Sequence, residues 1–182
     1  MKKIIPEKKM SNIAHSAKGL FTFKTDARNQ FYPYELLNYN PQPTLIVPLR
    51  RTAHGTQKLL DQHGFNIKNL HFVDIISKHI GSSLEHPNTK YLQKVKLSDI
   101  QEAIDEKMIE LGPGPKTIVL EDFHVLIPHH GDLNSRRFLD YLSKKMDYHF
   151  AKTIVLTDNK RLPKEVSKFL FTRSEDVIEI PK

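Results

Sequence analysis

The chain of 182 residues carries 28 lysines and arginines against 21 acidic residues, a formal net charge of +7, and it contains no cysteine. This length fits one domain with a single hydrophobic core. The absence of cysteine excludes disulfides, thiolate zinc sites and cysteine nucleophiles, and a reducing cytoplasm is the compartment we expect. No apolar run is long enough for a transmembrane helix, so we expect no membrane span.

The positive charge is concentrated near the start of the chain. Residues 1–28 hold seven basic and two acidic residues, which is +5 of the total +7. We therefore expect residues 1–18 to form a basic tail, in which Lys2, Lys3, Lys8 and Lys9 attract a polyanion through counterion release. The alternative is that the tail only keeps the protein in solution. Residues 19–182 then form one domain.

Short apolar runs alternate with stretches of helical periodicity in the first half of this domain. The pattern predicts strands at 20–24, 44–49 and 70–74, with helices around 34–38 and from about 53 to 63. The first helix ends before Pro41 and Pro43, and Gly64 ends the second.

The alternation continues in the second half. The pattern predicts strands at 91–95, 116–121, 153–157 and 177–180, with helices at 98–111, 134–149 and 163–171. Ser98 is the expected N-cap of the first of these helices, and residues 112–115 (GPGP) end it. Helical crossovers make the strands parallel, so we expect an α/β fold, a three-layer sandwich around a mostly parallel sheet.

Three segments carry a resemblance to a known family. They are residues 69–77 (NLHFVDIIS), residues 117–122 (TIVLED) and residues 136–139 (RRFL). With the order of the elements, they make residues 19–180 resemble the RecA/KaiC superfamily, and more narrowly the degenerate KaiC-like domains of many uncharacterised archaeal proteins. The resemblance places Glu121 at the position of the Walker B aspartate.

The chain departs from that family at the phosphate loop. In active relatives the first strand leads into this loop, whereas residues 25–30 here read TDARNQ, without a glycine. None of the seven glycines precedes a lysine, so no G-x-x-x-x-G-K-[ST] motif exists. Asp26 also places a negative charge near the position of a bound phosphate, and Arg28 is the only nearby residue in this segment that could compensate it. We expect that ATP binding is lost and that no cofactor is used.

Glu121 and Asp122 end a predicted strand, at the edge where open α/β sheets bind ligands. We interpret them as vestigial, with one carboxylate bonded to a neighbouring loop, because adjacent strand residues face opposite sides of a sheet. Asp74, after the third strand, either contacts a ligand or caps a helix at 75–80.

Four nearby residues are candidate metal ligands: His124, His129, His130 and Asp132. With Glu121 and Asp122 they leave open a metal-dependent enzyme, but their spacing matches no helix-borne zinc motif. We favour an ordinary surface loop and expect no metal.

Six basic residues fall just after, or one loop beyond, the carboxyl end of a predicted strand: Arg50, Arg51, Arg136, Arg137, Lys160 and Arg161. A parallel sheet would bring them toward one edge, where arginine forks onto phosphates and lysine acts as a point charge. Apart from Phe123, the loops at 124–135 and 157–163 offer no aromatic residue for base stacking.

Two functions remain open. The resemblance together with the lost phosphate loop implies a non-catalytic binding or regulatory module that acts through a protein partner. The basic loops and tail favour instead an RNA-, DNA- or ribosome-binding protein. Relatives often assemble into rings or filaments, and their subunit interfaces commonly lie around the bound nucleotide. Because we expect no nucleotide here, the oligomeric state stays open.

Overall fold

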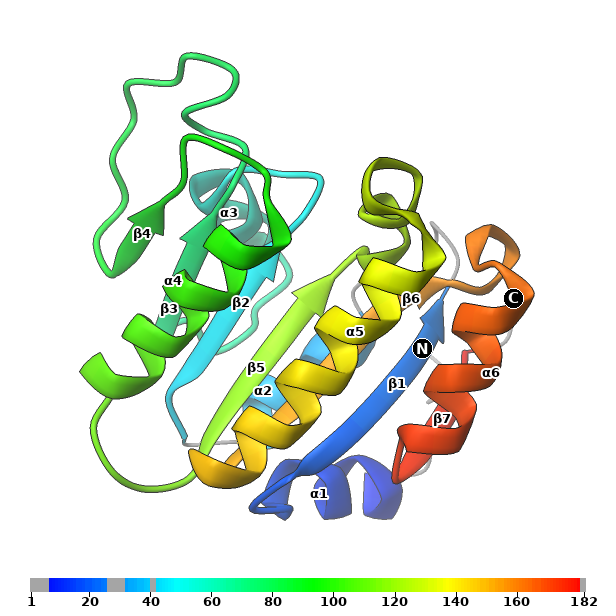
Figure 1. Ribbon diagram of the computed structural model, residues 1–182. Helices are drawn as coiled ribbons and strands as arrows, with labels where there is room; N and C mark the ends of the chain where they lie inside the picture. The colour runs from blue at the N-terminus through cyan, green and yellow to red at the C-terminus, as the bar shows by residue number, and fades with distance from the viewer. Residues whose placement is uncertain (1–6, 26–31, 40–41, 181–182) are drawn as a thin grey trace.

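The central feature of the computed structural model is a sheet of parallel strands between two layers of helices (Figure 1). The model describes residues 7–25, 32–39 and 42–180. Within these ranges the sheet has seven strands in the order β4-β3-β2-β5-β6-β1-β7, and every pair is parallel. The strands are β1 (Gly19–Thr25), β2 (Thr44–Pro48), β3 (Leu70–Asp74), β4 (Thr89–Tyr91), β5 (Lys116–Glu121), β6 (Ala151–Asp158) and β7 (Asp176–Glu179). The predicted α/β class is confirmed.

The helices divide between the two faces of the sheet. One layer contains α1 (Glu7–His15), α2 (Leu36–Tyr39) and α3 (Ala53–Gln62), and the other contains α4 (Leu97–Glu110), α5 (Ile127–Tyr148) and α6 (Lys164–Arg173). Short 3₁₀ turns, η1 (Tyr32–Glu35), η2 (Phe123–Val125) and η3 (Asn159–Arg161), lie before α2 and after β5 and β6. None of the helices in the described ranges combines the length and hydropathy needed to cross a bilayer.

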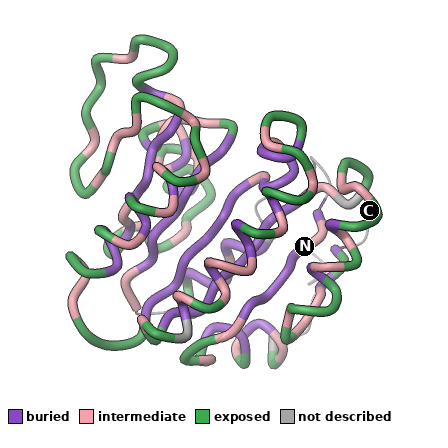
Figure 2. Tube along the Cα trace, in the orientation of Figure 1, coloured by how far each residue is buried: buried purple, intermediate pink, exposed green. Residues whose placement is uncertain are grey.

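The central strands are buried on both faces (Figure 2). Leu45 and Val47 of β2 belong to the core under α4, α5 and α6, whereas Ile46 between them belongs to the core under α1, α2 and α3. This explains why the strand sequences are continuous apolar runs rather than alternating ones. The carboxyl ends of the strands meet at one edge of the sheet, which we call the carboxyl edge.

Part of the segment that we expected to form a basic tail is a helix that packs on the sheet. Met10, Ile13 and Ala14 are buried against the sheet, because their three- and four-residue spacing places them on one face of α1. Lys8 is exposed, and Lys9 forms a salt bridge with Asp176 at 2.8 Å. Residues 7–15 are therefore part of the packed structure. Lys2 and Lys3 lie outside the described residues, as do Asp26 and Arg28.

Three predicted boundaries were wrong. The edge strand β4 is at Thr89–Tyr91 rather than 91–95, and α4 begins at Leu97, so the N-cap is Lys96 and not Ser98. The Ser98 hydroxyl instead donates to the carboxylate of Asp99. α5 begins at Ile127, not 134, and is kinked at Gly131, which has φ 76° and ψ 161°. Glycine adopts this positive φ without a steric penalty, so the helix continues beyond the kink.

Candidate functional site

The carboxylate of Glu121 lies in a buried cluster at the carboxyl edge. Glu121 ends β5 and is 4 % exposed. It accepts a hydrogen bond from Nη1 of Arg51 at 2.9 Å, and a longer one from Oγ1 of Thr56 at 3.4 Å. Arg51 follows β2, which pairs with β5 in a register that sets Pro48 opposite Glu121. The structure therefore brings together Glu121, which we interpreted as vestigial, and Arg51, which we predicted to bind a partner.

Burial dominates the electrostatics of this cluster. Desolvation raises the pKa of the Glu121 carboxyl, and the neighbouring Asp122 adds to this, while the Arg51 guanidinium opposes it. Desolvation also raises the pKa of the Tyr34 hydroxyl well above its usual range, with a further contribution from Glu121. The Tyr34 hydroxyl is buried, and it does not meet hydrogen-bond geometry with any described residue. The cluster is an ion pair between a buried carboxylate and a partly exposed guanidinium, beside a neutral phenol.

The hydrogen bonds of Glu121 leave neither of its carboxylate oxygens without a partner. A catalytic metal needs carboxylate oxygens facing an open position, whereas both Glu121 oxygens accept hydrogen bonds from Arg51 and Thr56. Asp122 adopts a left-handed conformation just after β5, and its Oδ2 is buried. Among the described residues, no three His, Asp or Glu side chains are grouped closely enough to hold an ion.

Asp74 has a structural role at the same edge. It is fully buried and accepts hydrogen bonds from the backbone of Ala53, Ile76 and Ser77 and from the Ser77 hydroxyl, at 2.6 to 2.8 Å. Residues 75–80 form turns rather than the predicted helix. Asp74 thus ties the turn after β3 to the start of α3, which accounts for it without a ligand.

The predicted histidine cluster does not form one surface loop. His124 is 5 % exposed, and its Nδ1 accepts a hydrogen bond from the backbone of Asp158 at 3.2 Å. Burial lowers the pKa of His124. The expectation of a surface residue is therefore wrong for His124, because the turn η2 folds it back against the end of β6. His129 is exposed, and His130 and Asp132 are half-buried.

Apart from Arg51, which pairs with Glu121, the predicted basic loop residues separate into two groups. Arg50 and Arg161 both lie near His124, where their charges contribute to its lowered pKa, so the loops after β2 and β6 meet around the end of β5. Arg161 is 61 % exposed and pairs with Asp158 at 3.3 Å, and Lys160 is exposed. Arg137 instead lines a groove between α4 and α5, beside the half-buried Arg136.

The basic residues of α1 belong to neither group. In Figure 1, α1 lies at the foot of the sheet, where the strands begin, and so at the opposite end from the carboxyl edge. Lys8 and Lys9 therefore do not extend the basic loops into one continuous surface.

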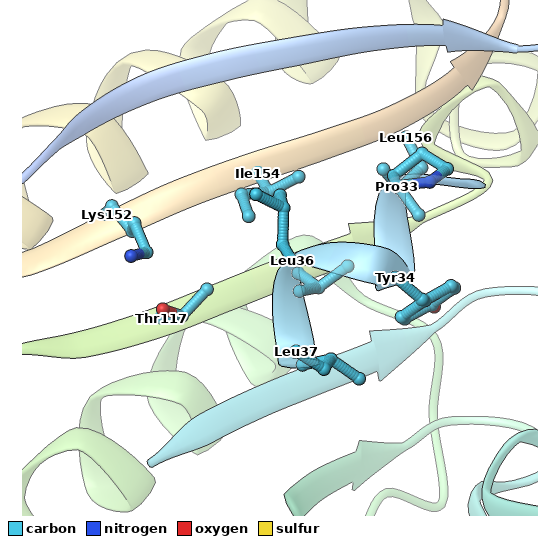
Figure 3. A pocket seen from close by; sticks show the side chains of 9 residues that line it. Pro33, Tyr34, Leu36, Leu37, Thr117, Lys152, Ile154 and Leu156 are labelled. Atoms are coloured by element: carbon cyan, nitrogen blue, oxygen red, sulfur yellow. The ribbon is translucent and has the colours of Figure 1, made fainter. Parts of the chain in front are cut away.

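A small enclosed cavity lies under α2. It measures about 10 Å³, and Figure 3 shows Lys152 and Thr117 at one end and Tyr34 at the other, with Leu36 and Leu37 between them. The space suffices for about one water molecule, so no nucleotide fits there. Neither this cavity nor the roles of Tyr34 and Thr56 could be predicted from the sequence, because the segments that meet here are far apart in the chain.

Comparisons with known proteins support the fold alone. No protein-family profile matches the chain, and no curated protein matches it. An uncharacterised protein of Pyrococcus horikoshii, solved in complex with an unknown peptide, is similar with a TM-score of 0.66 and 12% identity, over 88% of this chain and 76% of that one. A second Pyrococcus horikoshii protein, from a structural study, gives 0.61 and 11%, over 98% and 89%. A KaiC-like protein of Pyrococcus horikoshii gives 0.62 and 11%, over 92% and 74%. The chain has a RecA/KaiC-like fold.

Proposed function

We propose that this protein is a non-catalytic binding module that has kept a RecA/KaiC-like fold, lost nucleotide chemistry and acts on a protein partner. The observation that carries the proposal is the ion pair between Arg51 and Glu121. Phosphoryl-transfer enzymes need the acid at this strand end for a metal ion or for the attacking water. Here an internal guanidinium and the Thr56 hydroxyl occupy its oxygens.

Calorimetric titration with MgATP tests the loss of nucleotide binding. We expect no saturable heat up to about 1 mM, the upper end of the usual range of substrate affinities. Arg51→Met is the informative variant, because it removes the internal cation and leaves the acid in place. Saturable binding by the wild-type protein would contradict the proposal.

The partner surface that we propose is the carboxyl edge around Arg50, Lys160 and Arg161. These residues favour an acidic segment, since complementary charge steers encounter and sets specificity. The peptide bound to the similar Pyrococcus protein belongs to that protein, and it motivates testing peptides here. The cysteine-free composition agrees with a partner in a reducing cytoplasm.

Fluorescence anisotropy with labelled acidic and basic peptides of equal length tests this surface. We expect the acidic peptide to bind and the double variant Arg50→Glu/Arg161→Glu to weaken it by about tenfold or more. Lys8→Glu/Lys18→Glu is the matched control, because it reverses the same number of charges at exposed residues near the other end of the sheet. Equal losses in both variants would point to non-specific attraction and contradict the proposed surface.

A nucleic acid or ribosome is the second candidate partner, favoured by the same basic residues. The structure weakens the argument for a nucleic acid, because Phe123, the aromatic residue beside these loops, is fully buried and cannot stack on a base. The dependence of affinity on salt separates the two candidates. A nucleic acid should give a log–log slope of about 0.9 per neutralised phosphate for duplex DNA and about 0.7 for single strands.

A further inference from the structure

The imidazole of His124 joins the turn after β5 to the end of β6. His124 lies in η2 and is buried, and its Nδ1 accepts a hydrogen bond from the backbone N–H of Asp158 at 3.2 Å. Because a backbone N–H can only donate, this Nδ1 is unprotonated, and the neutral ring carries its proton on Nε2. Nε2 is enclosed and makes no hydrogen bond with any described residue. Neither ring nitrogen is therefore open to a ligand.

Asp158 connects this hydrogen bond to the two exposed cations that follow β6. Its side chain caps η3 by accepting from the backbone N–H of Lys160 at 3.0 Å, and its second carboxylate oxygen pairs with Nε of Arg161 at 3.3 Å. Asp158 thus bonds to His124 through its backbone and to the η3 turn through its carboxylate. A change that removes the acceptor at His124 should therefore loosen the start of η3.

Protonation of the ring is such a change. The imidazolium ion carries an N–H at both nitrogens, so the Nδ1–H would face the Asp158 N–H, and two donors do not bond to each other. The Asp158 amide would then lack its acceptor, and both ring N–H groups would be buried without a partner, each at a cost in free energy. The protonated ring is therefore favoured where water can reach it, away from the end of β6.

Charged side chains act on the ring from the loops that meet around it: Asp122 after β5, Asp158 at the end of β6, Arg161 in η3 and Arg50 after β2. Burial lowers the pKa of His124, and the two arginines add to this, whereas the two aspartates oppose it. On α5, which follows η2 along the chain, the nearest titratable residues are His129 and His130. The ring of His124 is therefore neutral at pH 7 and gains a proton only in acid.

We propose that His124 is a pH-sensitive latch, which holds η3 against the end of β5 while its ring is neutral and releases this turn when Nδ1 takes up a proton. Lys160 and Arg161 lie on the released turn. The latch would therefore also control the proposed partner surface, and this consequence alone rests on the proposed function.

NMR of the ¹⁵N-labelled full chain tests the latch in the absence of a partner. Long-range ¹H–¹⁵N spectra of the imidazole rings at about pH 7.5 should show His124 protonated at Nε2 only. On acidification to about pH 4.5, the amide signals of Asp158, Lys160 and Arg161 should shift together with the His124 ring, with a midpoint below the usual 6.5. A proton on Nδ1 at the higher pH, or a ring that stays neutral throughout, would overturn the proposal.

His124→Asn supplies the variant, because the side-chain carbonyl of asparagine can accept from the Asp158 amide but does not titrate. It should remove the part of the amide shifts that follows the His124 ring. His129→Asn, at an exposed site, should leave those shifts as they are in the wild type. Equal titration of the Asp158 amide in the wild type and in His124→Asn would also overturn the latch. The protonated nitrogen is identified in the wild type, so the test does not depend on the folding of a variant, and failure of the proposed partner surface would not alter its result.

Discussion

The side chain of Lys152 joins the middle of the sheet to the end of α1. Its Nζ donates to the carbonyl oxygen of Ala14 and, at 3.4 Å, to that of Ser16. Lys152 is fully buried, and no salt bridge to it occurs in the described part of the chain. Carbonyls at a helix end carry partial negative charge and commonly attract a cation. The buried ammonium therefore holds α1 against β6 without a carboxylate.

Burial lowers the pKa of Lys152 from its usual 10.5 to about 8. Between these two values the unfolded chain binds more protons at Lys152 than the folded protein, so the free energy of unfolding should rise as pH increases through this window. The measurement is urea unfolding at several pH values between about 8 and 9.5, below the ionisation of unfolded tyrosine.

Lys152→Met should flatten this rise, and Lys168→Met, at an exposed site on α6, should not. Part of the rise should survive in Lys152→Met, because burial also lowers the pKa of Lys116. Identical slopes in the wild type and in Lys152→Met would show that Lys152 does not lose its proton in this range.

Substitutions of Arg51 and Glu121 should have non-additive effects on the free energy of unfolding, because the two residues form an ion pair. Arg51→Met leaves a buried carboxyl without its cation and should cost about 2 to 3 kcal/mol of unfolding free energy, below the value for a fully buried pair because Arg51 is partly exposed. Combining it with Glu121→Gln should restore much of this loss. Chemical denaturation of the two single variants and the double variant gives the coupling energy, and additive losses would argue against the pair.

Asp74→Ala should be among the most destabilising polar substitutions in this protein. It removes the acceptor of four hydrogen bonds in a fully buried position, for which we expect a loss of about 3 kcal/mol or more. Ser77→Ala, which removes one donor, should cost about 1 kcal/mol. Thermal unfolding of both variants checks the ranking, and similar losses in the two would refute the structural role of Asp74.

The docking of α1 can be tested by truncating its buried face. Ile13→Ala should cost about 2 to 4 kcal/mol, because a buried isoleucine loses most of its side chain. Lys8→Ala, at an exposed position of the same helix, should have little effect. Equal and small effects of both substitutions would favour the basic tail.

The sequence predicted those parts of the fold that depend on local pattern. The sequence predicts a buried strand at 116–121 because the apolar run is continuous, and a helix from about 53 to 63 because Gly64 marks its end; the structure has them at 116–121 and 53–62. α1 was missed because its three buried residues stand among lysines. We did not predict that α5 begins before the bend at Gly131, because a glycine in this stretch is typical of a loop and not of a helix.

The candidate site was less predictable than the fold. Glu121 and Arg51 were both identified, but their pairing depends on β2 and β5 lying side by side, which strand order along the chain does not show. Tyr34 approaches Glu121 from η1 and Thr56 approaches it from α3, and neither residue belongs to a recognisable sequence motif. The groove beside Arg137 depends in the same way on the packing of α4 against α5.

Steady-state ATP hydrolysis by the purified protein, compared with Glu121→Gln, tests the central claim most directly. We predict that the wild type and Glu121→Gln both show no turnover above a buffer blank containing Mg²⁺. Turnover by the wild type that Glu121→Gln abolishes would contradict the account, because it would show that Glu121 leaves its pairing with Arg51 and acts on a bound nucleotide.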